Sequence, residues 1–233
     1  MPRLAIVAAM EREVAPLIGS WRTRWIEHDG REYKLFEKEE AALICSGIGQ
    51  TPARRATEAI IRRTEPDRVL SVGFAGALDP ALRVGEIIEP RIVINAADGA
   101  RWDTGSGQGT LVSFAAVAGL DQKRKLRDSY GAAIVDMEAA AVAQGAEICR
   151  ASFAALKVVS DEACQSLPAL DKFIGADGTF RSARFALHVV FRPWVWGATI
   201  LLARNSSRAS GALCSALEMY MNRVVAEPIA ARD

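Results

Sequence analysis

Histidine and cysteine are scarce in this 233-residue chain, which has two histidines and four cysteines. With only His28 and His188, a site built on clustered histidines is nearly excluded. No cysteines show the spacing of a zinc site or of a secreted disulfide framework. We therefore expect no metal and no cofactor, and the reducing cytoplasm as the compartment. Acid and base chemistry is left mainly to carboxylates.

An excess of charge of one sign is also missing. The chain has 29 Lys and Arg against 28 Asp and Glu, a formal charge of +1, so we expect no nucleic-acid partner. The N-terminus runs directly into an apolar strand without a basic leader or a small-residue cleavage site, so no signal peptide is predicted. Half of the residues are hydrophobic and 24% are charged, the balance of a globular protein with a large core.

Short apolar runs typical of buried strands alternate with helical segments. We expect strands at 4–8, 41–45, 68–72, 87–94, 110–113, 132–135 and 153–159. One helix is expected over 53–63, capped by Thr51, and another over 138–149, packed closely against the sheet. This alternation predicts an α/β fold with three α/β/α layers and a mostly parallel central sheet. No linker divides the chain, so we expect one domain over 1–233, with an exposed loop over 96–109.

The segment 178–217 lacks Asp, Glu and Lys, but it carries five arginines among large apolar side chains. Pro193 interrupts its longest apolar run, which argues against a membrane-spanning helix. The composition suits an Arg/Trp-rich C-terminal helical extension, an amphipathic pair of helices making peripheral membrane contact. Equally, the aromatic side chains can pack on the core or on a partner subunit while the arginines face water.

Small or acidic residues follow several predicted strands, at the sheet edge where open α/β sheets bind ligands. Glu11 and Glu13 follow the first strand, where carboxylates can also simply complement a helix dipole. Two glycine-containing turns allow close approach of a ligand to the backbone, and two acidic segments follow later strands. These four segments are Ser46 to Gly49, Gly73 to Gly76, Asp136 to Glu138, and Ser160 to Glu162. Each alone is most simply a turn or a helix cap, but together they predict a ligand site.

The motifs A-M-E-x-E-V, S-G-I-G, G-x-A-G-x-L, V-G-E, D-M-E-A and V-S-D-x-A stand in this order over residues 4–163. This order resembles the purine nucleoside and uridine phosphorylase superfamily, and within it the methylthioadenosine/S-adenosylhomocysteine nucleosidase branch. The resemblance implies a single α/β domain around a distorted central sheet. It also implies a homodimer or higher homo-oligomer that acts on the N-glycosidic bond of a nucleoside.

The resemblance further implies roles for individual residues. Asp161 would protonate or hydrogen-bond N7 of the leaving purine while Ser160 orients its carboxyl, and for this Asp161 has to carry a proton. Glu138 would accept hydrogen bonds from the ribose hydroxyls, with Met137 against the sugar. Glu13 would activate the attacking water. The other substrate-binding residues implied are Ser46, Ile48, Phe74, Ala75, Gly76, Phe114 and Asp136.

The choice between water and phosphate as nucleophile depends on donors near the point of attack. Phosphorylases of the family carry an arginine shortly before the glycine turn, where this chain has Ser71. Glu11 and Glu13 would repel phosphate, and Arg12 between them is expected to face solvent. Hydrolysis is therefore favoured, and phosphate would be a co-substrate only if the protein is a phosphorylase.

Departures from the nucleosidase pattern concern the substrate. Phe74 replaces a small hydroxyl residue, 113–117 lacks an expected acid, and the stretch from Glu86 to Asp136 is short. With the C-terminal segment, these features are similar to hopanoid-associated members of the superfamily, which are implicated in removing adenine from adenosylhopane. The resemblance therefore implies release of adenine from a 5′-substituted adenosine.

The sequence leaves several alternatives open. Adenosylhopane is one candidate substrate, and methylthioadenosine or S-adenosylhomocysteine is the alternative. A third possible enzyme activity is that of a phosphate-dependent purine nucleoside phosphorylase. Outside enzymes, a silent nucleoside-binding module or a peripheral membrane adaptor would explain parts of the chain, but neither explains Glu13, Glu138 and Asp161 together.

Overall fold

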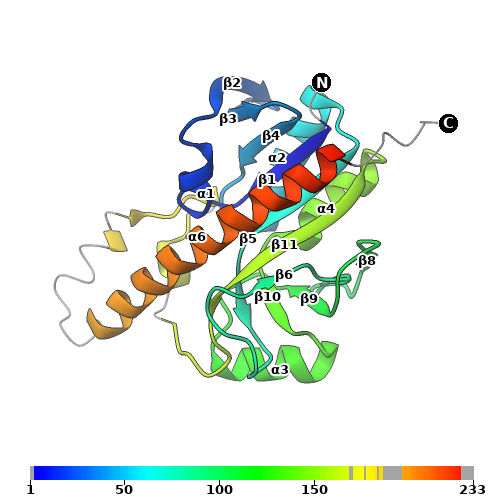
Figure 1. Cartoon of the computed structure of the whole chain (residues 1–233). Helices are drawn as coiled ribbons and strands as arrows, with labels where there is room; N and C mark the ends of the chain where they lie inside the picture. Colours follow the sequence, from blue (N-terminus) through cyan, green and yellow to red (C-terminus); the bar gives the residue numbers. More distant parts are fainter. Residues whose placement is uncertain (1–2, 168–169, 176, 183, 186–195, 227–233) are drawn as a thin grey trace.

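The computed structural model describes residues 3–167, 170–175, 177–182, 184–185 and 196–226. Eleven strands in this part of the chain form one mixed sheet (Figure 1). They are β1 Leu4–Ala8, β2 Arg22–His28, β3 Arg31–Lys38, β4 Ala41–Cys45, β5 Arg68–Ala77, β6 Ile87–Ile88, β7 Ile92–Asn95, β8 Arg101–Asp103, β9 Thr110–Ser113, β10 Ile134–Asp136 and β11 Ser152–Asp161. The helices are α1 Glu11–Ile18, α2 Gln50–Thr64, α3 Leu120–Tyr130, α4 Ala139–Ile148, the short 3-10 helix η1 Leu170–Phe173 and α6 Trp196–Ala226.

Strand β5 lies in the middle of the sheet. The path of paired strands is β2-β3-β4-β1-β5-β10-β9-β7-β8, and β11 pairs with β5 and β6. The pairs among β4, β1, β5 and β11 are all parallel, whereas β10 pairs antiparallel with the last residues of β5. The carboxyl ends of the parallel strands therefore meet at one edge, where ligands bind in open α/β sheets. The predicted α/β fold with a mostly parallel central sheet is confirmed.

Helices cover both faces of the sheet. On one face, apolar residues of α1 and α6 pack on β1, β5 and β11; on the other, α2 and α4 pack on β1 and β4. Neighbouring residues of β1 divide between these clusters, with Ile6 on the first face and Ala5 and Val7 on the second. Because side chains of β1 are buried on both faces of the sheet, the sequence of β1 is a continuous apolar run. Three layers result, as predicted.

Several predicted elements differ in extent from the observed ones. The strands at 4–8, 41–45 and 110–113 have the predicted bounds, whereas 87–94 divides into β6 and β7 and the loop over 96–109 contains β8. Thr51 was the wrong cap, because α2 begins at Gln50 with Gly49 as its N-cap. Gly49 has φ +102°, a conformation that favours glycine, so the chain turns directly from the sheet edge into the helix.

The hairpin of β2 and β3 and the helix α3 were not predicted. Both are rich in charged residues, so the apolar signal that identifies buried strands is weak in them. β2 and β3 pair antiparallel over seven residues from Arg22 to His28, at the margin of the sheet. In α3 only Lys123 and Leu126 are buried.

In the C-terminal segment the structure describes the long helix α6, and residues 182, 184 and 185 before it are also helical. The second half of α6 is part of the core, with Leu213, Leu217 and Tyr220 packed beside α1 and the sheet. The first turns extend beyond the sheet (Figure 1) and expose Trp196 and Ile200. Residues 186–195, which include the predicted first helix, lie outside the described residues. Among the described helices, none is both long and apolar enough to span a bilayer.

Candidate active site

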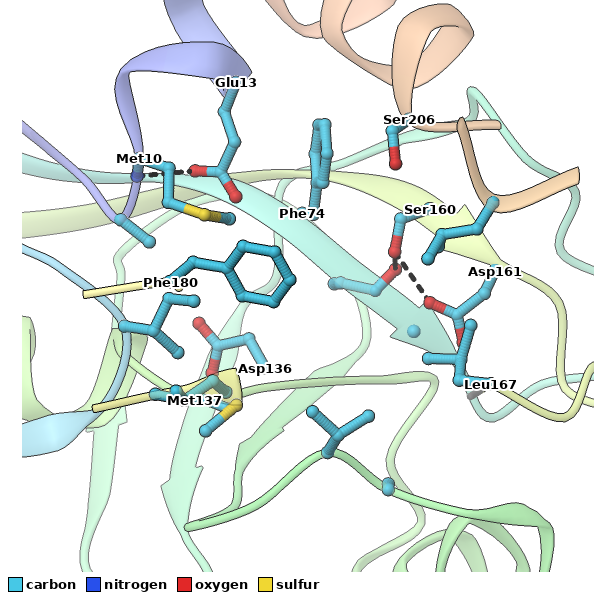
Figure 2. Close-up of a pocket in the computed structure, with 18 of the residues that line it drawn as sticks. Met10, Glu13, Phe74, Asp136, Met137, Ser160, Asp161, Leu167, Phe180 and Ser206 are labelled. Carbon is cyan, nitrogen blue, oxygen red and sulfur yellow. Dashed lines mark hydrogen bonds between the residues drawn. The ribbon is translucent and has the colours of Figure 1, made fainter. Parts of the chain in front are cut away.

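A cavity of about 280 Å³ opens at the carboxyl ends of β5, β10 and β11, beside the start of α1 and the first half of α6. Ten of the twelve residues predicted for the site line it, namely Glu13, Ile48, Phe74, Ala75, Gly76, Asp136, Met137, Glu138, Ser160 and Asp161. Figure 2 shows Glu13 and Asp161 on opposite sides of Phe74. Segments far apart in sequence therefore contribute to one cavity.

Two glycines of β5 make room for the two outer carboxylates. A Cβ atom on Gly73 would lie 3.1 Å from Glu13 Oε2, and one on Gly76 would lie 3.0 Å from Asp161 Oδ2. Gly73 also has φ +147°, which side chains rarely adopt. Three residues of strand separate these glycines by roughly 10 Å along β5. The two glycines of the G-x-A-G motif thus each leave space for one of the two carboxylates.

Glu13 is a buried carboxylate in the first turn of α1, with 3% of its surface exposed. Its Oε2 accepts a hydrogen bond from the Met10 N–H at 3.3 Å, so it also caps the helix. Burial raises the pKa of Glu13 above its usual value, while Lys157 opposes that shift. A carboxylate with a raised pKa is better matched to accept a proton near neutral pH. Glu13 is therefore a buried carboxylate suited to accept a proton, in addition to complementing the helix dipole.

Glu138 joins two of the predicted segments. It is the N-cap residue of α4, and its Oε1 accepts a hydrogen bond from the Gly49 N–H at 2.8 Å. Burial and the nearby Asp136 carboxylate raise the pKa of Glu138 to about 8. The D-M-E-A segment after β10 and the S-G-I-G turn after β4 are thereby held together at the cavity.

Asp136 lines the cavity, but its contacts are to protein groups. Oδ2 lies 2.8 Å from Lys157 Nζ and also accepts the Ala139 N–H, while Oδ1 accepts the Ser113 hydroxyl at 2.6 Å. Lys157 Nζ in turn donates to Ser71 Oγ at 3.0 Å. Both oxygens of Asp136 therefore have protein partners, through which the residue holds β9, β10, β11 and α4 in place, and its contact to substrate stays a prediction.

Asp161 is held on both sides. Ser160 Oγ donates to Oδ1 at 2.7 Å, so the predicted orienting contact is present (Figure 2). Lys123 Nζ forms an ion pair with Oδ2 and donates to the Glu162 carbonyl oxygen at 2.8 Å. Sequence reasoning missed Lys123, because nothing in the charged helix α3 distinguishes it from its exposed neighbours. It also missed Lys157, although a lysine inside an apolar strand signals a buried charge that needs a partner.

One side of the cavity is apolar. Its lining includes Leu167, Ile174, Phe180, Phe185 and Leu202, which come from the segment after β11 and from α6. The guanidinium carbon of Arg12 lies 5.1 Å from the centre of the Phe180 ring. Arg12 is exposed, as predicted, but it stands at the cavity rather than away from it.

Ser46 and Phe114 are not among the residues that line the cavity, and their roles in substrate binding stay predictions. Ser46 Oγ donates to the carbonyl oxygens of Ala8 and Gly47, so the buried hydroxyl secures its own turn. Phe114 packs beside the cluster that contains Ile94 and Val135. Between β9 and α3, the chain lines the cavity at residues 116–118.

A family model described as "Phosphorylase superfamily" matches residues 3–118 and 97–190. The 5′-methylthioadenosine/S-adenosylhomocysteine nucleosidase of Marinomonas sp. (strain MWYL1) is 33% identical over 97 residues, which are 38% of this chain and 39% of that protein. The match therefore spans about two fifths of that relative. The nucleosidase of the same description from Staphylococcus aureus (strain JH9) is 26% identical over 196 residues, covering 68% of this chain and 86% of that protein.

Solved structures show the same fold. The apo form of Arabidopsis thaliana 5′-methylthioadenosine nucleosidase has a TM-score of 0.74 at 17% identity and covers 98% of both chains. The S-adenosylhomocysteine nucleosidase of Streptococcus pyogenes, in complex with 5-methylthiotubericidin, has a TM-score of 0.70 at 17% identity and covers 97% of both chains.

Proposed function

The chain belongs to the phosphorylase superfamily, and from this premise we propose that it cleaves the N-glycosidic bond of a 5′-substituted adenosine by hydrolysis and releases adenine. The observation that carries the proposal is the single cavity in which Glu13, Glu138 and Asp161 meet. The names of the relatives, which are methylthioadenosine/S-adenosylhomocysteine nucleosidases, support this substrate class.

The arrangement divides the chemistry between the two ends of the cavity. Cleavage of the C1′–N9 bond leaves positive charge on the sugar and negative charge on the purine. Asp161 and its partners would receive the base and deliver a proton to N7, while Glu138 would accept the ribose hydroxyls. Glu13 would take the proton of the water that attacks C1′. A binding module would not need both an acid for the base and an activator for water.

Water is favoured over phosphate because the buried cations at the site are paired. Lys157 is paired with Asp136, and Lys123 is paired with Asp161. Among the described lining residues, the remaining cation is Arg12, whose guanidinium stacks on Phe180 beside the Glu13 carboxylate. A phosphate dianion would need unpaired donors near the point of attack.

The proposal is tested by incubating the protein with 5′-methylthioadenosine in ¹⁸O-labelled water, with and without phosphate. We expect adenine and a free sugar carrying ¹⁸O at C1, at a rate that phosphate does not change. Strict dependence on phosphate, with a sugar 1-phosphate as product, would make the protein a phosphorylase. Absence of adenine release from every 5′-substituted adenosine would overturn the proposal.

Glu138→Gln is expected to raise KM and lower kcat, because an amide is a weaker acceptor for ribose hydroxyls. Since the pKa of Glu138 is about 8 and the ionised form accepts best, kcat/KM of the wild type should rise with pH up to about that value. Because glutamine does not titrate, kcat/KM of Glu138→Gln should not show this rise with pH. Steady-state kinetics from pH 5 to 9 measure both effects, and an unchanged profile would remove Glu138 from the ribose site.

The same substitution has a predictable effect on stability. The folded-state pKa of Glu138 lies above its ordinary value, so the folded state favours the neutral carboxyl. This preference stabilises the folded protein at low pH, and the stabilisation is lost as pH rises through about 8. Glutamine is neutral throughout. Thermal unfolding should therefore show a higher Tm for Glu138→Gln than for wild type at pH 9, and little difference at pH 5.

The apolar side of the cavity favours a large apolar 5′ group, for which adenosylhopane is the candidate and methylthioadenosine the alternative. Leu202 of α6 lines the cavity, whereas Leu201 beside it is 47% exposed and does not. Leu202→Ser should lower kcat/KM for 5′-decylthioadenosine about tenfold, since about 1.5 kcal/mol of apolar burial is lost. Methylthioadenosine should be spared, and Leu201→Ser is the matched control. Equal losses on both substrates would remove Leu202 from the 5′ subsite.

The exposed start of α6 supports the proposal of peripheral membrane contact. Trp196, Ile200 and Leu201 are exposed there, and Arg204 follows in a segment without acidic residues. Such a surface suits an anionic bilayer. Flotation with phosphatidylglycerol vesicles should fall in a Trp196→Ser, Ile200→Ser double variant; equal flotation of the wild type and the variant would contradict the contact.

The cytoplasmic location and the homodimer or higher homo-oligomer stay predictions.

A further inference from the structure

Lys123 is a buried cation that the roles assigned above do not use. It lies in the first turn of α3 with only 2% of its surface exposed, and it lines the cavity. Removing an ammonium group from water is costly unless the group is paired. Lys125, two residues further along the same helix, is exposed. The buried lysine therefore stands out from an otherwise solvated helix.

The contacts of Lys123 bear directly on the state of Asp161. One carboxylate oxygen accepts the Ser160 hydroxyl, and the other is paired with Lys123 Nζ. A carboxylate with a hydrogen-bond donor on each oxygen and an ammonium group beside it is held as the anion. An anion has no proton to give to N7. In this arrangement the proton for N7 needs a source beside Asp161.

The Lys123 ammonium group carries hydrogens that the Asp161 carboxylate lacks. A lysine ammonium has three hydrogens, and the contacts to Asp161 and to the Glu162 carbonyl oxygen account for two. Gly76 of β5 is the close neighbour of both side chains, since a Cβ there would lie 3.0 Å from Asp161 Oδ2 and 3.4 Å from Lys123 Cε. The pair is thus packed against the strand that forms the floor of the cavity.

We propose that Lys123 is a positioning residue that holds the proton destined for N7 of the leaving purine. The inference rests on the proposed function. A proton passes from Lys123 Nζ to Asp161 Oδ2, and then from Asp161 to N7 as the C1′–N9 bond breaks. Glu13 takes a proton from the attacking water as its oxygen bonds to C1′. Lys123 is left as a neutral amine and recovers its proton from solvent, while Glu13 releases the proton that it took from water to solvent, so one water is consumed and no net charge is created.

The other ionisable groups that line the cavity do not replace this function. Glu13 and Glu138 belong to the sugar side, and Asp136 is paired with Lys157. Arg12, from α1, stacks on Phe180. Within α3, Arg124 pairs with the exposed Asp121. Among the described residues, Lys123 is the cation in contact with Asp161.

The test compares Lys123→Met with the control Lys125→Met, using adenine release from 5′-methylthioadenosine between pH 5 and 9. Loss of the stored proton should lower kcat of Lys123→Met about 100-fold at pH 8, with KM changed less than about threefold. Asp161 alone would then have to take its proton from solvent. The alkaline limb of the kcat profile should therefore move to lower pH by at least about one unit, and Lys125→Met should match wild type.

Lys123→Arg separates proton storage from simple charge. Arginine keeps the ion pair but does not release its proton, so this variant should fold and still show the low kcat. Wild-type activity in Lys123→Arg or Lys123→Met would overturn the inference, as would a profile lowered uniformly without a shift. If the wild type releases no adenine, the proposed function fails instead, so the two failures are distinguishable.

Discussion

Replacing Asp161 by asparagine is expected to lower kcat for adenine release about 1,000-fold, while KM changes less than about threefold. Asparagine has nearly the same shape, and its amide oxygen can still accept one of the two hydrogen bonds that Ser160 and Lys123 donate to Asp161, but it cannot carry a proton to N7. The contact matters most as the C1′–N9 bond breaks, so the loss falls on the transition state. Steady-state kinetics with 5′-methylthioadenosine measure both constants.

Glu162→Gln is the matched control for Asp161→Asn. Glu162 is the adjacent carboxylate, its side chain does not line the cavity, and its contact to Lys123 is made by the main chain. This variant should keep wild-type kinetics. An Asp161→Asn variant that loses substrate affinity as much as turnover would show that Asp161 serves binding, and the assignment of proton transfer to Asp161 would then be wrong.

Glu13→Gln is expected to have an effect of similar size on hydrolysis. Glutamine can still accept the Met10 N–H and keep the first turn of α1 in place, but it cannot take a proton from water. Loss of a positioned base costs about 100- to 10,000-fold in rate. Single-turnover measurements of sugar formation, with substrate affinity measured separately by calorimetry, test the prediction.

Glu11→Gln controls for the charge of this helix start. Glu11 is exposed, and its carboxylate pairs with Lys34. Its substitution should leave the hydrolysis rate within about twofold of wild type, as expected for a surface carboxylate. If Glu13→Gln hydrolyses methylthioadenosine as fast as wild type, Glu13 is a structural cap, and the water must be activated elsewhere.

The parts of the fold that the sequence predicted well are the buried parallel strands. β1 and β4 are continuous apolar runs because both faces are covered by helices, and such runs are conspicuous. The β2–β3 hairpin, in which charged residues interrupt the apolar ones, lacks that signal. The extent of α6, which runs to Ala226, was not predicted, because polar residues such as Arg204 and Arg208 divide its apolar faces in the sequence.

The sequence identified most of the residues that line the cavity, but not the contacts between them. Acids directly after strands are visible in the sequence, and the family resemblance assigned their roles. Contacts between distant segments are not visible: Lys123 and Asp161 are 38 residues apart, and Lys157 reaches Ser71 across 86 residues. Phe114 was assigned to the site by the family resemblance, whereas the residues that line the cavity between β9 and α3 are 116–118.

The central claim is that Glu13, Glu138 and Asp161 surround one nucleoside. A crystal structure of the slow Asp161→Asn variant with bound 5′-methylthioadenosine tests it most directly. The account predicts N7 within hydrogen-bond distance of residue 161, the ribose hydroxyls on Glu138, and a water between Glu13 and C1′. A nucleoside bound outside this cavity, or oriented with its purine against Glu13, would contradict the account.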